Sequence, residues 1–159
     1  MAGSIVDIAN KGLTYLGANA ITALTDDTVE GRAINRIHEQ SRQYCLRDHP
    51  WNFAMTRVAL AADTTEEWAV EGRNIVSDAA APLNILYIAD ITDTSIYDAK
   101  FTEAYAMRLA SDVAYEITSS QTVVASASAA YATLIQEARL VDAQETTSAS
   151  EDTWLSARA

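Results

Sequence analysis

The chain contains few of the residues on which most enzyme sites depend. Its 159 residues include one cysteine, two histidines and five glycines. The glycines form neither a GxGxxG nor a GxxxxGK[ST] pattern, so we expect no phosphate-binding loop. The single cysteine, Cys45, has no partner for an internal disulfide, which is typical of a reducing compartment.

Long hydrophobic runs and basic residues are also scarce. No run of about 18 apolar residues occurs, so we expect no membrane-spanning helix. The first residues, Met-Ala-Gly-Ser-Ile-Val-Asp, lack the basic region and apolar core of a signal peptide. Lysine and arginine number 11 against 22 acidic residues, giving a formal charge of −11. Such a chain repels phosphate backbones, so we expect no tight DNA or RNA binding.

Three residues form the one candidate for a zinc or thiol site. His38 and Cys45 fall two turns apart on a predicted helix, and His49 follows one turn later. No cysteine pair and no HExxH or GxSxG motif supports them. We therefore predict that the chain is not an enzyme and has no catalytic, cofactor or metal site. A small hydrolase that uses Cys45 or the carboxylates remains an alternative.

Hydrophobic periodicity predicts a mainly α-helical fold: a bundle of about four helices with a small antiparallel β insert and an extended C-terminal tail. The first helix is expected to begin at Ser4 and end at Gly17. The second begins near 25–28, where Asp27 and Glu30 have capping-box spacing, and ends before Pro50. We expect a helical domain over 1–143, with the insert at about 55–91, and a tail over 144–159.

The stretch 82–117 is predicted to organise the core. Residues 82–91 have the pattern of a strand covered on both faces, and apolar residues then recur every fourth position from Phe101 to Ile117. A last helix follows the possible caps Ser119 and Ser120 and reaches about 141. The predicted core residues are Trp51, Phe53, Ile85, Tyr87, Phe101, Tyr105, Leu109, Val113, Tyr131 and Leu134.

Two helices offer candidate subunit interfaces. Arg32, Arg36 and Arg42 lie in a mixed-charge stretch, for which a solvated face is the alternative. Small residues dominate 125–132, where Ala125, Ala129 and Ala132 would let a second helix approach closely; a poorly specified exposed helix is the alternative. Residues 144–153 are too polar to pack alone, and we expect Trp154, Leu155 and Arg158 to bind a partner.

The order of several short stretches resembles the tail tubular protein A family, the head-to-tail adaptors of short-tailed bacteriophages. The stretches are Arg47-Asp-His-Pro-Trp-Asn-Phe, Pro82-Leu-Asn-Ile-Leu-Tyr-Ile, Phe101-Thr-Glu-Ala-Tyr and Leu109-Ala-Ser-Asp-Val-Ala-Tyr-Glu-Ile-Thr. The likeness covers roughly 4–143 and consists of packing motifs rather than chemical ones.

The resemblance implies a structural virion protein with a helical bundle and a small β dock. It further implies a homo-oligomer, a dodecameric ring, at the head–tail junction between the portal protein and the tail nozzle protein, assembled in the host cytoplasm. DNA then passes through the lumen without specific binding. We expect no membrane association and no cofactor. The alternative is an acidic soluble helical module that binds a basic host or viral protein, or mimics DNA.

Overall fold

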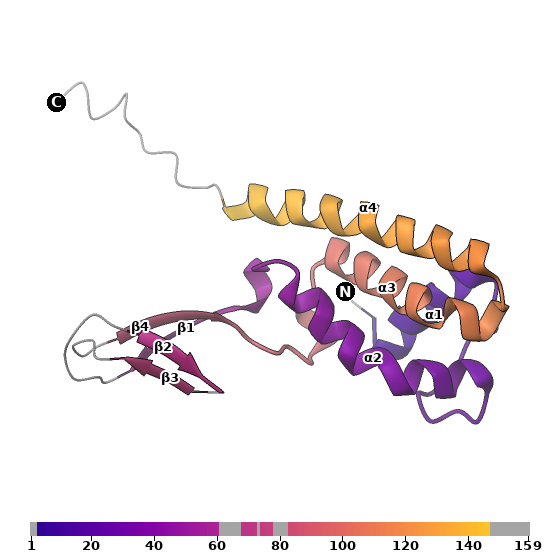
Figure 1. Cartoon of the computed structure of the whole chain (residues 1–159), viewed down its shortest axis with the longest axis horizontal. Helices are drawn as coiled ribbons and strands as arrows, with labels where there is room; N and C mark the ends of the chain where they lie inside the picture. Colours follow the sequence, from indigo (N-terminus) through magenta and orange to yellow (C-terminus); the bar gives the residue numbers. More distant parts are fainter. Residues whose placement is uncertain (1–2, 61–67, 73, 78–82, 147–159) are drawn as a thin grey trace, which may run out of the picture.

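The computed structural model describes residues 3–60, 68–72, 74–77 and 83–146 (Figure 1). Within these ranges the chain is mainly helical, with small antiparallel strand pairs, which confirms the predicted fold class. The helices are α1 (Ile5–Leu16), α2 (Val29–Arg47), α3 (Ala99–Thr118) and α4 (Gln121–Thr146), with short 3₁₀ turns η1 (Asn52–Ala54) and η2 (Thr94–Ile96). The strands are β1 (Met55–Leu60), β2 (Trp68–Glu71), β3 (Asn74–Ser77) and β4 (Leu83–Ile88).

Helix α1 begins and ends where its sequence predicts. Ser4 and Asp7 form a capping box, in which each side chain accepts a hydrogen bond from the other's backbone N–H. Gly17 ends the helix with φ +69°, a left-handed conformation that glycine adopts without a Cβ penalty. The following link is held by Asn10, whose amide donates to the Ile21 carbonyl at 2.9 Å and accepts from the Ile21 N–H at 2.8 Å.

Helix α2 is capped by a different residue from the one predicted. The Thr28 hydroxyl accepts the Gly31 N–H at 3.0 Å, while Asp27 forms an ion pair with Arg32 instead of capping. Both side-chain types suit an N-cap, so only the position of the first turn distinguishes them. Tyr44 on this helix is 52% exposed.

Helix α3 is the centre of the molecule, because α1, α2 and α4 all pack against it (Figure 1). Aromatic rings gather at its start, where Phe101 lies 5.1 Å from Trp51, 4.9 Å from Phe53 and 5.0 Å from Tyr97, measured between ring centroids. Such edge-to-face pairs add to the stability gained from burial. Of the predicted core residues, these are buried: Trp51, Phe101, Tyr105, Leu109, Val113 and Tyr131; Phe53 and Leu134 are partly buried against them.

Helix α4 lies along α3 and covers it with one face (Figure 1). Ala127, Tyr131, Ile135 and Ala138 are buried at intervals of three and four residues, as a one-faced helix requires. Ser120 accepts the Val123 N–H at 3.4 Å and so caps the first turn, as predicted. The helix continues to Thr146, past the predicted boundary at 143, and the rest of the predicted tail lies outside the described residues.

The strands project from one end of the helical body (Figure 1). β1 pairs antiparallel with β4, from Met55↔Ile88 to Leu60↔Leu83, and β2 pairs antiparallel with β3. The prediction that 82–91 is covered on both faces is wrong for the single chain. Leu86, Tyr87 and Ile88 are 52%, 43% and 39% exposed. Pairing with β1 covers neither face of β4, and no described helix packs extensively on it. Tyr87 is therefore not a core residue, and Ile85 is half-buried.

Candidate functional site

Cys45 lies inside the core, where it is poorly suited to act as a nucleophile. Its side chain is fully buried, its Sγ is 3.7 Å from the Tyr131 hydroxyl, and burial raises the thiol pKa from 9.0 to about 12. The thiolate, not the thiol, is the reactive form. Each histidine has another partner: His38 Nδ1 lies 3.0 Å from the Asn35 carbonyl, and His49 lies beside Asp142. Among the described residues, no group of three or more His, Cys, Asp or Glu side chains could hold a metal ion.

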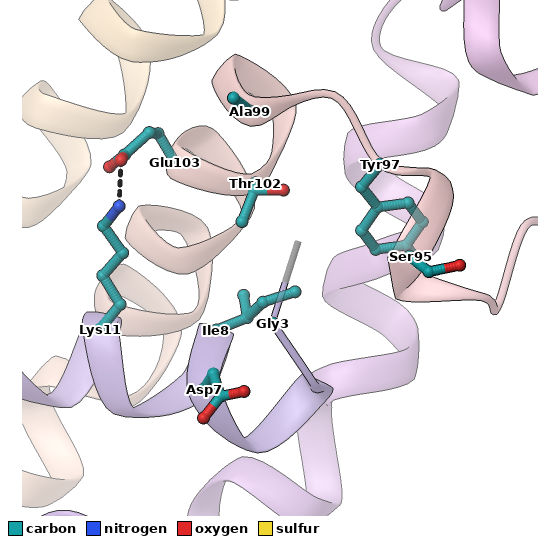
Figure 2. A pocket seen from close by; sticks show the side chains of 9 residues that line it. All are labelled: Gly3, Asp7, Ile8, Lys11, Ser95, Tyr97, Ala99, Thr102 and Glu103. Carbon is teal, nitrogen blue, oxygen red and sulfur yellow. Dashed lines mark hydrogen bonds and ion pairs between the residues drawn. The ribbon is translucent and has the colours of Figure 1, made fainter. Parts of the chain in front are cut away.

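A hollow of about 470 Å³ lies between the starts of α1 and α3 and the η2 turn (Figure 2). Its charged side chains already have structural partners. Asp7 accepts the Ser4 N–H at 2.7 Å within the capping box, and Lys11 forms an ion pair with Glu103, drawn as a dashed line in Figure 2. The first contact caps α1, and the second joins α1 to α3. The hollow brings together no pair of groups arranged for acid–base or nucleophilic catalysis.

Two of the arginines predicted at a subunit interface form ion pairs within the chain. Arg32 pairs with Asp27 in the turn before α2, and Arg36 pairs with Glu116 on α3. All four side chains are well exposed to solvent, and such surface pairs contribute about 0–1 kcal/mol to folding. Either arginine can therefore exchange its partner for one on another molecule at little cost.

The third arginine, Arg42, has a different place. Its guanidinium reaches Asp90, just after β4, with Nε and Nη2 each 3.2 Å from a carboxylate oxygen, and Gln43 donates to the same carboxylate at 3.2 Å. The Arg42 side chain is 11% exposed. Because this fork is paired and mostly covered, we assign Arg42 to fixing the strands on α2 rather than to a subunit interface.

The alanines predicted at an interface lie on the exposed side of α4. Ala125, Ala129 and Ala132 are all exposed, opposite the buried face that packs on α3. A helix surface made of small side chains lets another backbone approach closely. The structure thus leaves this face open, and no described residue of the chain covers it.

Sequence reasoning missed a groove between α2 and β4, which we call the α2–β4 groove. It has a volume of about 640 Å³ and is lined by Gln43, Leu46, Arg47, Tyr87, Ile88, Ala89 and Asp90. Leu46 is almost fully buried and forms part of the floor, whereas Tyr87 and Ile88 are largely exposed. The apolar run of β4 is the available signal, but its composition predicts a covered strand rather than the wall of a groove.

A polar contact between α4 and the corner after α2 was also missed. Asp142 Oδ2 lies 3.0 Å from His49 Nε2, and Asp142 Oδ1 accepts the Asn52 N–H at 2.9 Å. One turn earlier on α4, Arg139 forms an ion pair with Asp48 at 2.7 Å. These residues are far apart in sequence, and no local pattern links them. The contacts fix the C-terminal part of α4 beside the end of α2.

The residues predicted to bind a partner through the tail, Trp154, Leu155 and Arg158, lie outside the described residues. In the part of the chain that is described, no helix combines the length and the apolar character needed to cross a bilayer.

Comparison with known proteins gives no assignment, because no family model matches the chain and no curated protein matches it either.

Proposed function

We propose that the chain is a head-to-tail adaptor of a short-tailed bacteriophage, forming a ring between the portal protein and the tail nozzle protein and letting DNA pass. The observation that carries the proposal is the exposed β1–β4 ribbon, whose residues Leu86, Tyr87 and Ile88 are consecutive, apolar and open to solvent. It stands in the part of the sequence that resembles the adaptors' strand signature.

A ribbon of this kind favours an assembled protein over a monomeric enzyme. Two-stranded sheets are marginal in water unless something covers them, and contiguous apolar patches commonly mark interaction sites. Alternate residues of β4 point to opposite faces, so Tyr87 and its neighbours Leu86 and Ile88 expose apolar surface on both sides. Neighbouring copies or a second virion protein would supply the missing cover.

A closed ring also needs two different faces on each subunit. The exposed alanines of α4, Ala125, Ala129 and Ala132, suit one face because a neighbouring helix can approach them closely. Arg32 and Arg36 of α2 suit the other, because their present ion pairs are exposed and weak. The net charge of −11 suits the channel, since an acidic lumen repels the phosphate backbone of passing DNA.

The test measures the mass of the purified chain, alone and mixed with the portal protein of the same virus. An adaptor should give a ring, or a defined multiple of the chain bound to the portal ring. Electron microscopy of particles carrying a C-terminal tag on the chain should then place the tag at the head–tail junction. A single low-order species that ignores the portal contradicts the proposal.

The tail has its own part in this proposal, in which Trp154, Leu155 and Arg158 dock on the portal or an adjoining subunit. Deleting 147–159 leaves α4 whole and should abolish assembly onto portal-capped heads. A matched variant with the tail kept and these three residues changed to serine should behave like the deletion. Unchanged assembly in both variants would remove the tail from the mechanism.

A second candidate is an acidic helical module that binds a basic host or viral protein. The observation in its favour is the excess of 22 acidic over 11 basic residues. Such a module acts as a monomer or dimer, and its binding weakens steeply with added salt because charge supplies much of the attraction. The mass measurement above separates the two candidates.

A further inference from the structure

The α2–β4 groove combines an apolar lining with an arginine that has no ion-pair partner among the described residues. Leu46, Tyr87 and Ile88 supply the apolar part, and Arg47 is exposed at the edge. The volume of about 640 Å³ falls within the roughly 300–1,000 Å³ of pockets that enclose small ligands. It is therefore large enough to receive two side chains of a peptide.

Within the described ranges, the ion pairs near the groove do not include Arg47. Asp90 is neutralised by Arg42, and Asp48 is neutralised by Arg139. Arg47 forms no ion pair with any described residue, although it lies in the last turn of α2, where the helix dipole favours a cation. An apolar groove with an arginine at its edge suits a peptide that carries a carboxylate next to apolar side chains.

The chain contains such a peptide beyond the described residues: Glu151-Asp152-Thr153-Trp154-Leu155 has two adjacent carboxylates followed by two large apolar side chains. We infer that, in the free chain, this segment docks into the α2–β4 groove of the same molecule. Trp154 and Leu155 cover the apolar lining, and a carboxylate of Glu151 or Asp152 pairs with Arg47. The inference concerns the chain before any partner binds and does not depend on the adaptor role.

The segment can reach the groove. Asp142 contacts His49 at 3.0 Å, so the last turns of α4 lie beside the end of α2, which carries Arg47. From Thr146 to Trp154 the chain extends up to roughly 26–29 Å, at about 3.3–3.6 Å per residue. Docking on the same molecule also has a high effective concentration, because the segment is tethered beside its site.

Other occupants fit the groove less well. A basic peptide meets the positive charge of Arg47, and nucleic acid is repelled by the charge of −11. A second copy of the chain could deliver the same tail segment, and the experiment below separates that case from docking on the same molecule.

The experiment uses disulfide formation in the full chain. The native Cys45 is fully buried, so cysteines introduced by Gln43→Cys, at the groove, and Leu155→Cys, in the tail, react without interference. The matched control pairs Leu155→Cys with Gln136→Cys, since Gln136 is an exposed glutamine on α4 within reach of the tail but away from the groove. Products are separated by size under non-reducing conditions after mild oxidation.

We expect an intramolecular disulfide for the 43–155 pair at a rate at least about tenfold above the 136–155 control. Adding Arg47→Glu should slow it several-fold, and adding Glu151→Lys with Asp152→Lys to that variant should restore the rate. Equal rates for the two pairs, or no effect of the charge changes, would overturn the inference. Predominantly disulfide-linked dimers would also overturn it, in favour of docking on a second copy.

Discussion

His49 and Asp142 join the corner after α2 to the C-terminal part of α4, with the ring Nε2 3.0 Å from the carboxylate Oδ2. The other carboxylate oxygen accepts the Asn52 N–H at 2.9 Å, and the Asp142 side chain is 7% exposed. The Asp142 carboxylate therefore contacts two polar groups, the His49 ring and the Asn52 N–H, both in the segment that leads into the strands. The position of the last turns of α4 depends on it.

We predict that Asp142→Ala lowers the free energy of unfolding by about 1–3 kcal/mol, because it removes the carboxylate that the part-buried Asn52 N–H and the His49 ring contact. Urea denaturation followed by circular dichroism measures the change. Glu145→Ala is the matched control: it removes an exposed carboxylate from the same end of α4 and should change stability by less than about 0.5 kcal/mol. Equal losses for both variants would contradict the assigned role.

The buried thiol of Cys45 should make the folded protein less stable at alkaline pH. Burial raises its pKa from 9.0 to about 12, so the folded chain holds the thiol proton more tightly than the unfolded chain does. The resulting stabilisation is complete below pH 9 and is lost as pH rises from 9 to about 12, by about 1.4 kcal/mol per pH unit. The comparison is between the wild-type chain and Cys45→Ala, by denaturant unfolding at several pH values in that window. The wild-type chain should lose stability faster, and parallel pH profiles would contradict the buried thiol.

Gly12 lies where α1 approaches the backbone of α3 closely. A Cβ at Gly12 lies 2.5 Å from the Ala106 carbonyl oxygen, so Gly12→Ala should destabilise by about 1–3 kcal/mol despite the better helix propensity of alanine. Gly17 is the comparison, because a Cβ there meets nothing within 4 Å and only its φ of +69° opposes a side chain. Asparagine, which tolerates that conformation, should be accepted at 17 and not at 12. Thermal unfolding of Gly12→Ala, Gly12→Asn, Gly17→Ala and Gly17→Asn distinguishes the steric cause at 12 from the backbone cause at 17.

The sequence predicts the helices well because their signals are local. Ser4 and Asp7 are three residues apart and cap α1, and Gly17 ends it. Apolar residues recur at every fourth position from Phe101 to Ile117. This pattern is strong because three other helices cover α3, which requires apolar residues over much of its length. The bounds of these helices are set by residues close together in the sequence.

The sequence does not predict the exposure or pairing of a side chain where these depend on residues far away in the chain. The apolar run in β4 has the composition of a strand with two covered faces, yet among the described residues β4 pairs only with β1, and no helix packs extensively on it. Tyr44 has the spacing of a core residue but remains at the surface, where the Arg108 guanidinium lies 4.1 Å from its ring centre. Pairs such as Arg42–Asp90 arise from helix and strand packing, which no single stretch of sequence specifies.

The exposed residues of β4 give the prediction that bears most directly on the adaptor role. Leu86→Lys combined with Ile88→Lys should leave the helical circular dichroism and the unfolding midpoint of the free chain nearly unchanged, because neither side chain is part of the helical core. The same variant should fail to form a ring or to bind the portal, because two desolvated charges oppose burial of the ribbon. Tyr115→Lys, at a 57% exposed apolar residue of α3 away from the strands, is the control and should assemble normally. If the β4 variant assembles as well as this control, the ribbon is not an assembly surface.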